Sequence, residues 1–198
     1  MKRIGLAALL TGISIIFFSG IVNASVLDFE IFHSTAVDQS YGDNIGDTPN
    51  VTVSYYTSGT GPLTTYTGYG SGYTAIPSSG YDYTAEVTFE AEQGYLVTIN
   101  SFDMGTWQGG DYNPNLFEIV DGVGTKIWEP ASLDIGNGLS TYVPNVTGEA
   151  VTIRWRIDGQ NTIGIDNINF SQSAVPIPGA VWLLGSGLLG LVSLKKRR

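Results

Sequence analysis

The sequence predicts an all-β fold: a single antiparallel β-sandwich or jelly roll, flanked by an N-terminal signal helix and a C-terminal membrane helix. Between residues 25 and 173, apolar and polar residues alternate with a period of two, and glycine, asparagine, aspartate and proline interrupt the pattern. No stretch of this region keeps a helical period for three turns. The 198 residues include no cysteine, so a core must stabilise the domain in place of disulfides.

The first part of the exported region predicts two strands separated by a polar loop. Val26 to Phe32 and Val51 to Tyr56 carry the strand pattern, and His33 to Pro49 between them is rich in aspartate, glycine and asparagine. Thr57 to Gly80 is rich in glycine, serine, threonine and tyrosine, which indicates either strand and loop or a mobile segment. Its tyrosines form a platform for sugar rings or are ordinary strand residues.

Two β-hairpins are predicted in the middle of the chain. Ala85 to Glu92 alternates between apolar and polar residues, and Tyr95 to Ile99 continues the pattern after a turn at Gln93-Gly94. Leu116 to Val120 and Thr125 to Glu129 form the second hairpin around an Asp-Gly-Val-Gly turn. We expect the two strands of each hairpin to pair with each other.

The last two strands are strongly apolar. Val151 to Ile157 predicts a long central strand, and Arg154 and Arg156 on its polar face either hold an acidic sugar or offset acidic side chains across the sheet. Ile163 to Phe170 predicts the final strand, but its apolar residues change face half-way. Because side chains alternate strictly along a strand, this change requires a bulge near Asp166-Asn167 or burial of both faces.

The N-terminus has the composition of a secretory signal peptide. Lys2 and Arg3 precede a largely apolar stretch from Ile4 to Val22, and Val22-Asn23-Ala24 is a small-residue cleavage site. We expect cleavage after Ala24. The alternative is an uncleaved N-terminal anchor.

The C-terminus combines a Pro-x-Pro step at Pro176 and Pro178, an apolar run from Gly179 to Leu194, and four cations from Lys195 to Arg198. Apolar residues beside a basic cluster indicate a membrane segment whose charged end stays in the cytoplasm. The run is shorter than the ~20 residues that span a bilayer, and it is rich in glycine. Both properties favour a processed tail over a permanent anchor.

The charge distribution indicates that the region between the two apolar segments is exported. Residues 25–173 hold only three of the nine Lys and Arg residues but all 18 acidic residues, which gives a net charge of −15. Because positively charged ends stay inside, both tips begin in the cytoplasm and the acidic region crosses the membrane. Its acidic surface would repel phosphates, which excludes nucleic acid as a partner, and it is compatible with divalent cations.

We therefore expect three parts: a signal peptide at 1–24, an extracytoplasmic β-domain at 25–173, and a tail with a transmembrane helix and a basic end at 174–198. Ser171 to Ala174 is expected to be a short linker into this tail. About 150 residues are enough for one domain with its own core.

The tail resembles a known class of sorting signal. Val175 to Gly179, Trp182, the Gly-Ser-Gly-Leu-Leu-Gly segment at 185–190 and the basic end are similar to PEP-CTERM signals of Gram-negative bacteria, in the VPLPA-CTERM variant, with Ile177 for Leu and Gly179 for Ala. The resemblance implies recognition by an exosortase, a membrane enzyme of bacteria that make exopolysaccharide. It also implies transit through the inner membrane to the cell surface or extracellular matrix. The implied sorting residues are Val175, Pro176, Ile177, Pro178, Gly179, Lys195, Lys196, Arg197 and Arg198.

A second resemblance concerns the fold. Gly164 to Phe170, as a closing strand, is similar to the ends of galactose-binding-like jelly rolls in other PEP-CTERM proteins. The alternative for the tail is an ordinary single-pass anchor, because a short glycine-rich span with a basic end can also serve that purpose.

One candidate site is the loop from Asp103 to Asn115. Its acidic and amide side chains suit calcium, and its aromatic residues can stack on a sugar. The alternative is a plain turn-forming loop, since its spacing is not that of an EF-hand. The residues that we nominate for ligand binding are Trp107, Asp111, Tyr112 and Asn113, with Asp103 and Asp111 as calcium ligands.

A second candidate site depends on the fold. In jelly rolls the first and last strands are often neighbours, so Asp28 and Glu30 could meet Asp158 and Asp166 at a structural calcium ion. Asp28 and Asp166 are the ligands nominated there. The alternative is that these carboxylates are solvated charges on strand faces.

No catalytic group is evident in the sequence. His33 is the only histidine, no Gly-x-Ser-x-Gly motif surrounds it, and no pair of carboxylates stands out. We expect a non-enzymatic surface or extracellular-matrix protein associated with exopolysaccharide and biofilm. The alternatives are a calcium-assisted carbohydrate-binding module and a secreted glycoside hydrolase.

Overall fold

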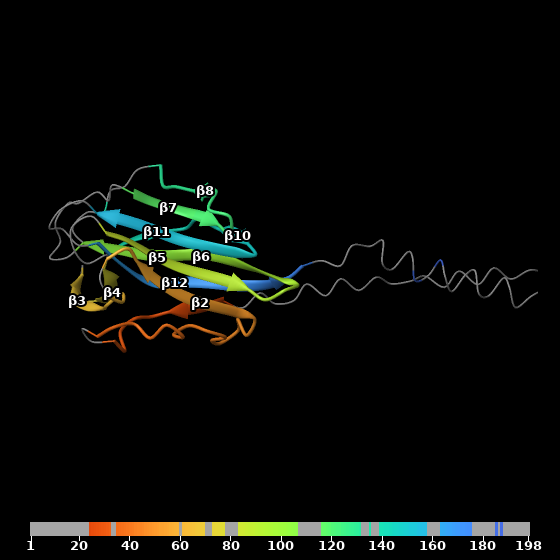
Figure 1. Ribbon diagram of the computed structural model, residues 1–198, viewed down its shortest axis with the longest axis horizontal. Coiled ribbons are helices and arrows are strands. Elements are labelled where there is room, and N and C mark those ends of the chain that lie inside the picture. Colours follow the sequence, from red (N-terminus) through yellow and green to blue (C-terminus); the bar gives the residue numbers. More distant parts are fainter. Residues whose placement is uncertain are drawn as a thin grey trace, which may run out of the picture.

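The computed structural model describes residues 24–32, 35–59, 61–69, 73–77, 83–106, 116–131, 135, 139–157, 163–175, 185 and 187. These residues form twelve β-strands in two antiparallel sheets with almost no helix, so the predicted all-β class is confirmed (Figure 1). In this part of the chain, no helix combines the length and apolar character that crossing a membrane requires. The predicted signal peptide before Ala24 and nearly all of the tail after Val175 lie outside the described residues.

The two sheets have different strand orders. The five-stranded sheet has the order β2-β5-β11-β7-β8. Its strands are β2 (Val51–Thr57), β5 (Tyr83–Ala91), β11 (Ala150–Ile157), β7 (Leu116–Asp121) and β8 (Lys126–Trp128). The seven-stranded sheet has the order β10-β6-β12-β4-β3, and β1 also pairs with β12 and β9 with β6. Its strands are β1 (Ala24–Leu27), β3 (Tyr66–Tyr69), β4 (Tyr73–Pro77), β6 (Tyr95–Thr106), β9 (Leu139–Tyr142), β10 (Val146–Gly148) and β12 (Ile163–Ala174).

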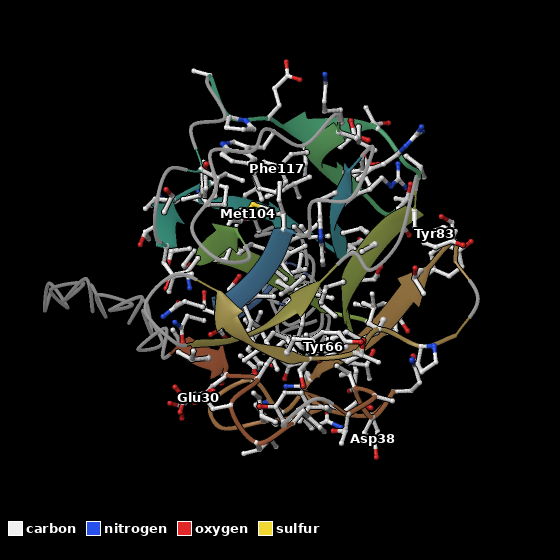
Figure 2. The ribbon with its side chains drawn as sticks, turned by 90° about the vertical axis from the view of Figure 1, so that its left-hand side faces the viewer. Glu30, Asp38, Tyr66, Tyr83, Met104 and Phe117 are labelled. Atoms are coloured by element: carbon white, nitrogen blue, oxygen red, sulfur yellow. The ribbon has the colours of Figure 1, made fainter. Side chains whose placement is uncertain are left out.

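The core lies between the inner faces of the two sheets. Alternate residues of the long strands are buried, among them Phe89 in β5 and Trp155 in β11, which are fully buried. The rings of Phe89 and Phe170, which belong to opposite sheets, lie 4.8 Å apart between centroids. Figure 2 shows Met104 and Phe117 among the side chains inside the domain. Face-to-face packing of this kind gives a sandwich.

The first predicted hairpin is wrong. β5 and β6 both turn apolar residues to the core, but they belong to different sheets: β5 pairs with β2 and β11, and β6 pairs with β9, β10 and β12. The turn at Gln93-Gly94 carries the chain from one sheet to the other. Alternation shows which residues of a strand face the core, but it does not identify the partner strand.

Other predicted strands are confirmed. β7 and β8 form the second hairpin, whose turn is held by the Asp121 carboxylate, which accepts hydrogen bonds from the Val123 and Thr125 amides. β11 lies between β5 and β7, as expected of a central strand. β2 matches the predicted second strand, and β3 and β4 confirm that the segment after Thr57 contains strands.

Two boundaries differ from the prediction. The first strand ends at Leu27 rather than Phe32, although Phe29 is still fully buried. Residues 171–174 are not a linker, because they complete β12 and pair with Tyr95 to Thr98 of β6. The Val175 amide then donates to the Gly94 carbonyl at 2.9 Å. The start of β6 needs these partners for its own backbone groups, so the sheet extends to the edge of the tail.

The predicted bulge in the final strand is confirmed, and β6 carries a matching one. The pairing of β12 with β6 shifts register between Asp166 and Asn169 and again between Asn169 and Phe170. Asn167 has a positive φ of 49°. The bulge changes the parity of β12, so that Ile165 and Ile168 are both fully buried. In β6 the buried positions likewise change parity, between Ile99 and Phe102.

The free edge of β2 is closed by the preceding loop. The Asp43 carboxylate accepts from the Val53 amide at 2.6 Å, and the Asn44 amide donates to the Val51 carbonyl at 2.8 Å. An unpaired edge strand is a template for pairing with another chain. The polar composition that predicts a loop before β2 therefore also supplies the groups that cover its edge.

The bulge predicts different outcomes for two substitutions of Asn167. Alanine and glycine both remove the side-chain amide, but only alanine has a Cβ that disfavours the left-handed backbone. We expect Asn167→Ala to lower the free energy of unfolding by about 1 kcal/mol more than Asn167→Gly. Urea unfolding of both variants measures the difference. Equal stability of the two variants would contradict the left-handed conformation at this position.

Candidate functional site

The pairing of β1 with β12 brings together acidic residues that are far apart in the sequence. Leu27 is the register partner of Ile168, so Asp28 follows directly beside the bulge. Asp166 of β12 is in turn the register partner of Asp103 of β6. The expectation that the first and last strands are neighbours is confirmed. Asp28, Asp103 and Asp166, which the sequence assigned to two separate sites, lie in one region of the seven-stranded sheet.

Asp166 is the least solvated carboxylate of this group, with a relative exposure of 0%. Its Oδ1 accepts hydrogen bonds from the Asn167 amide at 2.8 Å and the Phe29 amide at 3.4 Å. Its Oδ2 is buried and has no hydrogen-bond partner among the described residues. A buried oxygen without a partner is costly when it carries charge, so this position favours a proton or another neutralising group.

Asn167 links Asp166 to Asp103. Its side-chain amide donates to Oδ2 of Asp103 at 2.9 Å, and the Thr141 hydroxyl donates to Oδ1 at 2.6 Å. Both oxygens of Asp103 are therefore occupied by protein donors. Because Asp103 lies within β6 and is paired on both sides, the prediction that it begins a loop is wrong.

An aromatic group covers the neighbouring turn at Asp28. The Tyr41 hydroxyl donates to the Asp28 carbonyl. The Tyr41 ring lies 5.8 Å from that of Phe29 and 4.7 Å from that of Phe32. Burial and the nearby Asp28 charge raise the pKa of Tyr41, so it remains a neutral hydrogen-bond donor. The Asp28 carboxylate accepts from the Glu30 amide at 2.8 Å. Figure 2 shows Glu30 at the outside of this region.

Burial raises the pKa of Asp166 to about 7. This pKa is the net of burial, which raises it most, of the hydrogen bonds from the Asn167 and Phe29 amides, which lower it, and of the smaller effect of the Asp28 and Asp103 charges, which raise it. The charged form of Asp166 is therefore destabilised by its surroundings. In the described part of the chain, no three His, Cys, Asp or Glu side chains are grouped to hold a metal ion. Calcium at Asp28 and Asp166 stays a prediction.

Most of the other nominated residues lie outside the part of the chain that the structure describes. Trp107, Asp111, Tyr112 and Asn113 lie outside the described residues, as do His33 and Asp158. Thr106 and Leu116, which flank the nominated ligand-binding residues, end β6 and begin β7 at the same end of the domain. Val175 is 41% exposed, and the rest of the sorting motif falls outside the described ranges.

Arg154 offsets acidic side chains across the sheet, which is one of the two roles that the sequence predicts for it. It lies between β5 and β7 and forms ion pairs with Glu86 at 2.7 Å and Glu118 at 3.3 Å. The sheet register places these three side chains in one row. An arginine that already binds two carboxylates has little capacity left for an acidic sugar.

A groove at one end of the domain was not predicted. It has a volume of about 590 Å³ and lies between the β7–β8 turn and the β10–β11 junction. Glu90, Asp121 and Glu149 line it, and Val123 beside it is 88% exposed. No sequence signal identifies this groove, because its walls come from three separate parts of the chain.

Comparison with known proteins gives no relative. No model of a known protein family matches this chain. A search of the curated proteins likewise finds no match. The function is therefore argued from the residues and their geometry.

The environment of Asp166 predicts an unusual dependence of stability on pH. The unfolded chain releases this proton near pH 4, but the folded chain keeps it to about pH 7. The folded state therefore binds more protons in this window, and stability falls as pH rises from 4 to 7, by at most about 4 kcal/mol. In Asp166→Asn this loss should be absent. Urea unfolding between pH 4.5 and 8 measures it.

The exposed Glu92 supplies a matched control, since Glu92→Gln also removes one carboxylate. This variant should retain the wild-type pH dependence. Parallel pH curves for the wild type and Asp166→Asn would show that Asp166 does not hold its proton as described.

Proposed function

We propose that this chain is an exported, non-enzymatic protein of the bacterial surface or extracellular matrix, sorted by an exosortase-type membrane enzyme. The observation that carries the proposal is the order of features in the tail: a Pro-x-Pro step, a short glycine-rich apolar run and four terminal cations. The acidic domain and the basic N-terminus support export. A role in exopolysaccharide or biofilm follows from the resemblance of the tail to PEP-CTERM signals.

The position of the chain ends supports this proposal. Ala24 is the register partner of Ser171, and Val175 follows β12 directly. The predicted signal peptide and the predicted sorting tail thus leave the domain at the same end. Before processing, both basic tips stay on the same side of the membrane and both apolar segments lie in it. The two segments must then leave the domain at the same end.

The proposal also includes the type of sandwich. We assign the sandwich to the jelly rolls of galactose-binding-like type. The neighbouring first and last strands and the bulged closing strand from Gly164 to Phe170 support this assignment. Such folds bind ligands through their loops in many unrelated proteins, so the fold alone does not specify an activity.

We also propose that the domain has no catalytic activity. Arg154 pairs with both Glu86 and Glu118, and Asp103 accepts hydrogen bonds on both oxygens. Glycoside hydrolysis needs two free carboxyl groups, one that protonates the leaving oxygen and one that acts as a base or as the nucleophile. These four side chains are engaged in structural contacts instead.

A second candidate function is calcium-assisted carbohydrate binding. The observation that favours it is the unpartnered Oδ2 of Asp166, which lies in the same region as Asp28 and Asp103. A calcium ion would neutralise these charges through oxygen ligands. In this case the aromatic residues of the 103–115 loop, led by Trp107, would supply the sugar-stacking surface.

The sorting proposal predicts a shortened chain in the native host. Intact-mass analysis of the mature protein should give an N-terminus at Ser25 and a C-terminus between Val175 and Gly179. Replacing Pro176 and Pro178 with alanine should leave the N-terminal cleavage unchanged and preserve the basic end. A wild-type chain that still ends at Arg198 would support the ordinary anchor instead.

The second candidate predicts that calcium raises the melting temperature of the full chain and that Asp166→Asn abolishes the increase, because the variant loses a ligand charge. Glu92→Gln should retain the response. Trp107→Ala should lose any saturable glycan binding without a change in melting temperature. Glycan turnover that disappears on changing a single carboxylate would contradict the non-enzymatic assignment.

A further inference from the structure

The predicted signal-cleavage site lies inside a strand of the folded sheet. Ala24 and Ser25 begin β1 and pair with Ser171 and Phe170 of β12. The side chain of Ser25 is only 6% exposed. A protease acts on an extended segment that can enter its own active site, and a paired strand between other elements does not meet this requirement.

Ser25 also holds the loop that follows β1. Its hydroxyl donates to the Ile45 carbonyl at 2.9 Å and accepts from the Asp47 amide at 3.1 Å. The hydroxyl of the fully buried Thr48 lies 3.1 Å away and donates to it. The peptide bond between Ala24 and Ser25 is therefore fixed on one side by β12 and on the other by residues 45–48.

Two glycines let this loop lie directly on β1. A Cβ at Gly46 would lie 2.9 Å from the Ser25 hydroxyl oxygen, and a Cβ at Gly42 would lie 2.5 Å from Cδ2 of Leu27. Both glycines have positive φ, of 51° and 93°. Leu27 itself is fully buried. The loop is thus shaped to receive the strand, and the docked strand leaves no room for another chain beside it.

We propose that docking of β1 and cleavage after Ala24 exclude each other, so that the N-terminal segment is removed before the first strand closes the sandwich. The inference builds on the export proposed above. While β1 is undocked, the edge of β12 from Ile168 to Ser171 is unpaired and the Leu27 site is empty. When cleavage comes first, β1 docks afterwards from Ser25 onward and closes this edge, so removal of the signal peptide precedes completion of the fold.

A reversible cross-link tests the proposal, and the chain contains no cysteine that would interfere. Val26 and Asn169 are register partners, so their Cα atoms lie within the range that a disulfide can bridge. The full-length Val26→Cys/Asn169→Cys chain is folded in detergent, oxidised, and incubated with a bacterial signal peptidase. We expect cleavage at Ala24–Ser25 to be at least tenfold slower than after reduction, because cleavage follows the population of the open strand.

Two single-site variants complete the test. Leu27→Asp should accelerate cleavage of the folded chain at least tenfold, because it places a charge in the buried site. Val26→Asp, at a position that is 46% exposed, should change the rate less than twofold. Fluorescence of the buried Trp155 shows whether the sandwich stays folded in each variant.

Three results would overturn the proposal. The first is that the oxidised double variant is cut as fast as its reduced form. The second is that the disulfide does not form in the folded chain. The third is that the urea-unfolded wild type is not cut at Ala24. Each is independent of the sorting proposal, which concerns the C-terminus and is tested by the mass of that end.

Discussion

The antiparallel pairing of β12 with β6, with its matched irregularities, is the interaction on which the rest of the fold depends. β12 is the strand to which β1 and β4 also attach. Its bulge at Asn167 turns Ile165 and Ile168 to the same core, and the change of parity near Asn100 does the same for β6. The Asn100 side-chain amide donates to Oδ1 of the Asn169 side chain at 2.8 Å, so the two irregular segments are joined. A one-residue slip in the register of either strand would turn its apolar side chains away from the core.

The sequence predicts features that depend on neighbouring residues better than features that depend on distant ones. The bulge in β12 was predictable because alternation fails within one strand. The β7–β8 hairpin was predictable because Asp121 and its turn lie between the two strands. The pairing of β5 was not predictable, since its register partners lie 28 to 40 residues away in β2 and 60 to 74 residues away in β11, and a sandwich offers each apolar strand two sheets.

In the candidate site, too, the contacts between residues far apart in the sequence are the ones that are hardest to predict. The fold class predicts that β1 and β12 are neighbours, and this prediction alone places Asp28 near Asp166. Asp103 was assigned elsewhere, because its place opposite Asp166 depends on the register of β6 beyond Ile99. That register follows from Phe102 and Met104, whose change of parity is visible in the sequence once β6 is extended past Ile99. Asp166 is buried beside the Phe29 amide, which comes from the distant segment after β1, and no local sequence pattern indicates this burial.

The long strands also place the two ends of the domain far apart. β12 has twelve residues, which at ~3.3 Å per residue place Ile163 about 35 Å from Ala174. Thr106, the last residue of β6 and part of the nominated segment from Asp103 to Asn115, pairs with Ile163, whereas Ala24 and Val175 lie near the opposite end. This distance exceeds several Debye lengths at physiological salt, so charges at one end have little influence on the other. In the proposed sorting, a ligand bound at the end of the domain near Thr106 would not block the membrane enzymes that act at the end near Ala24 and Val175.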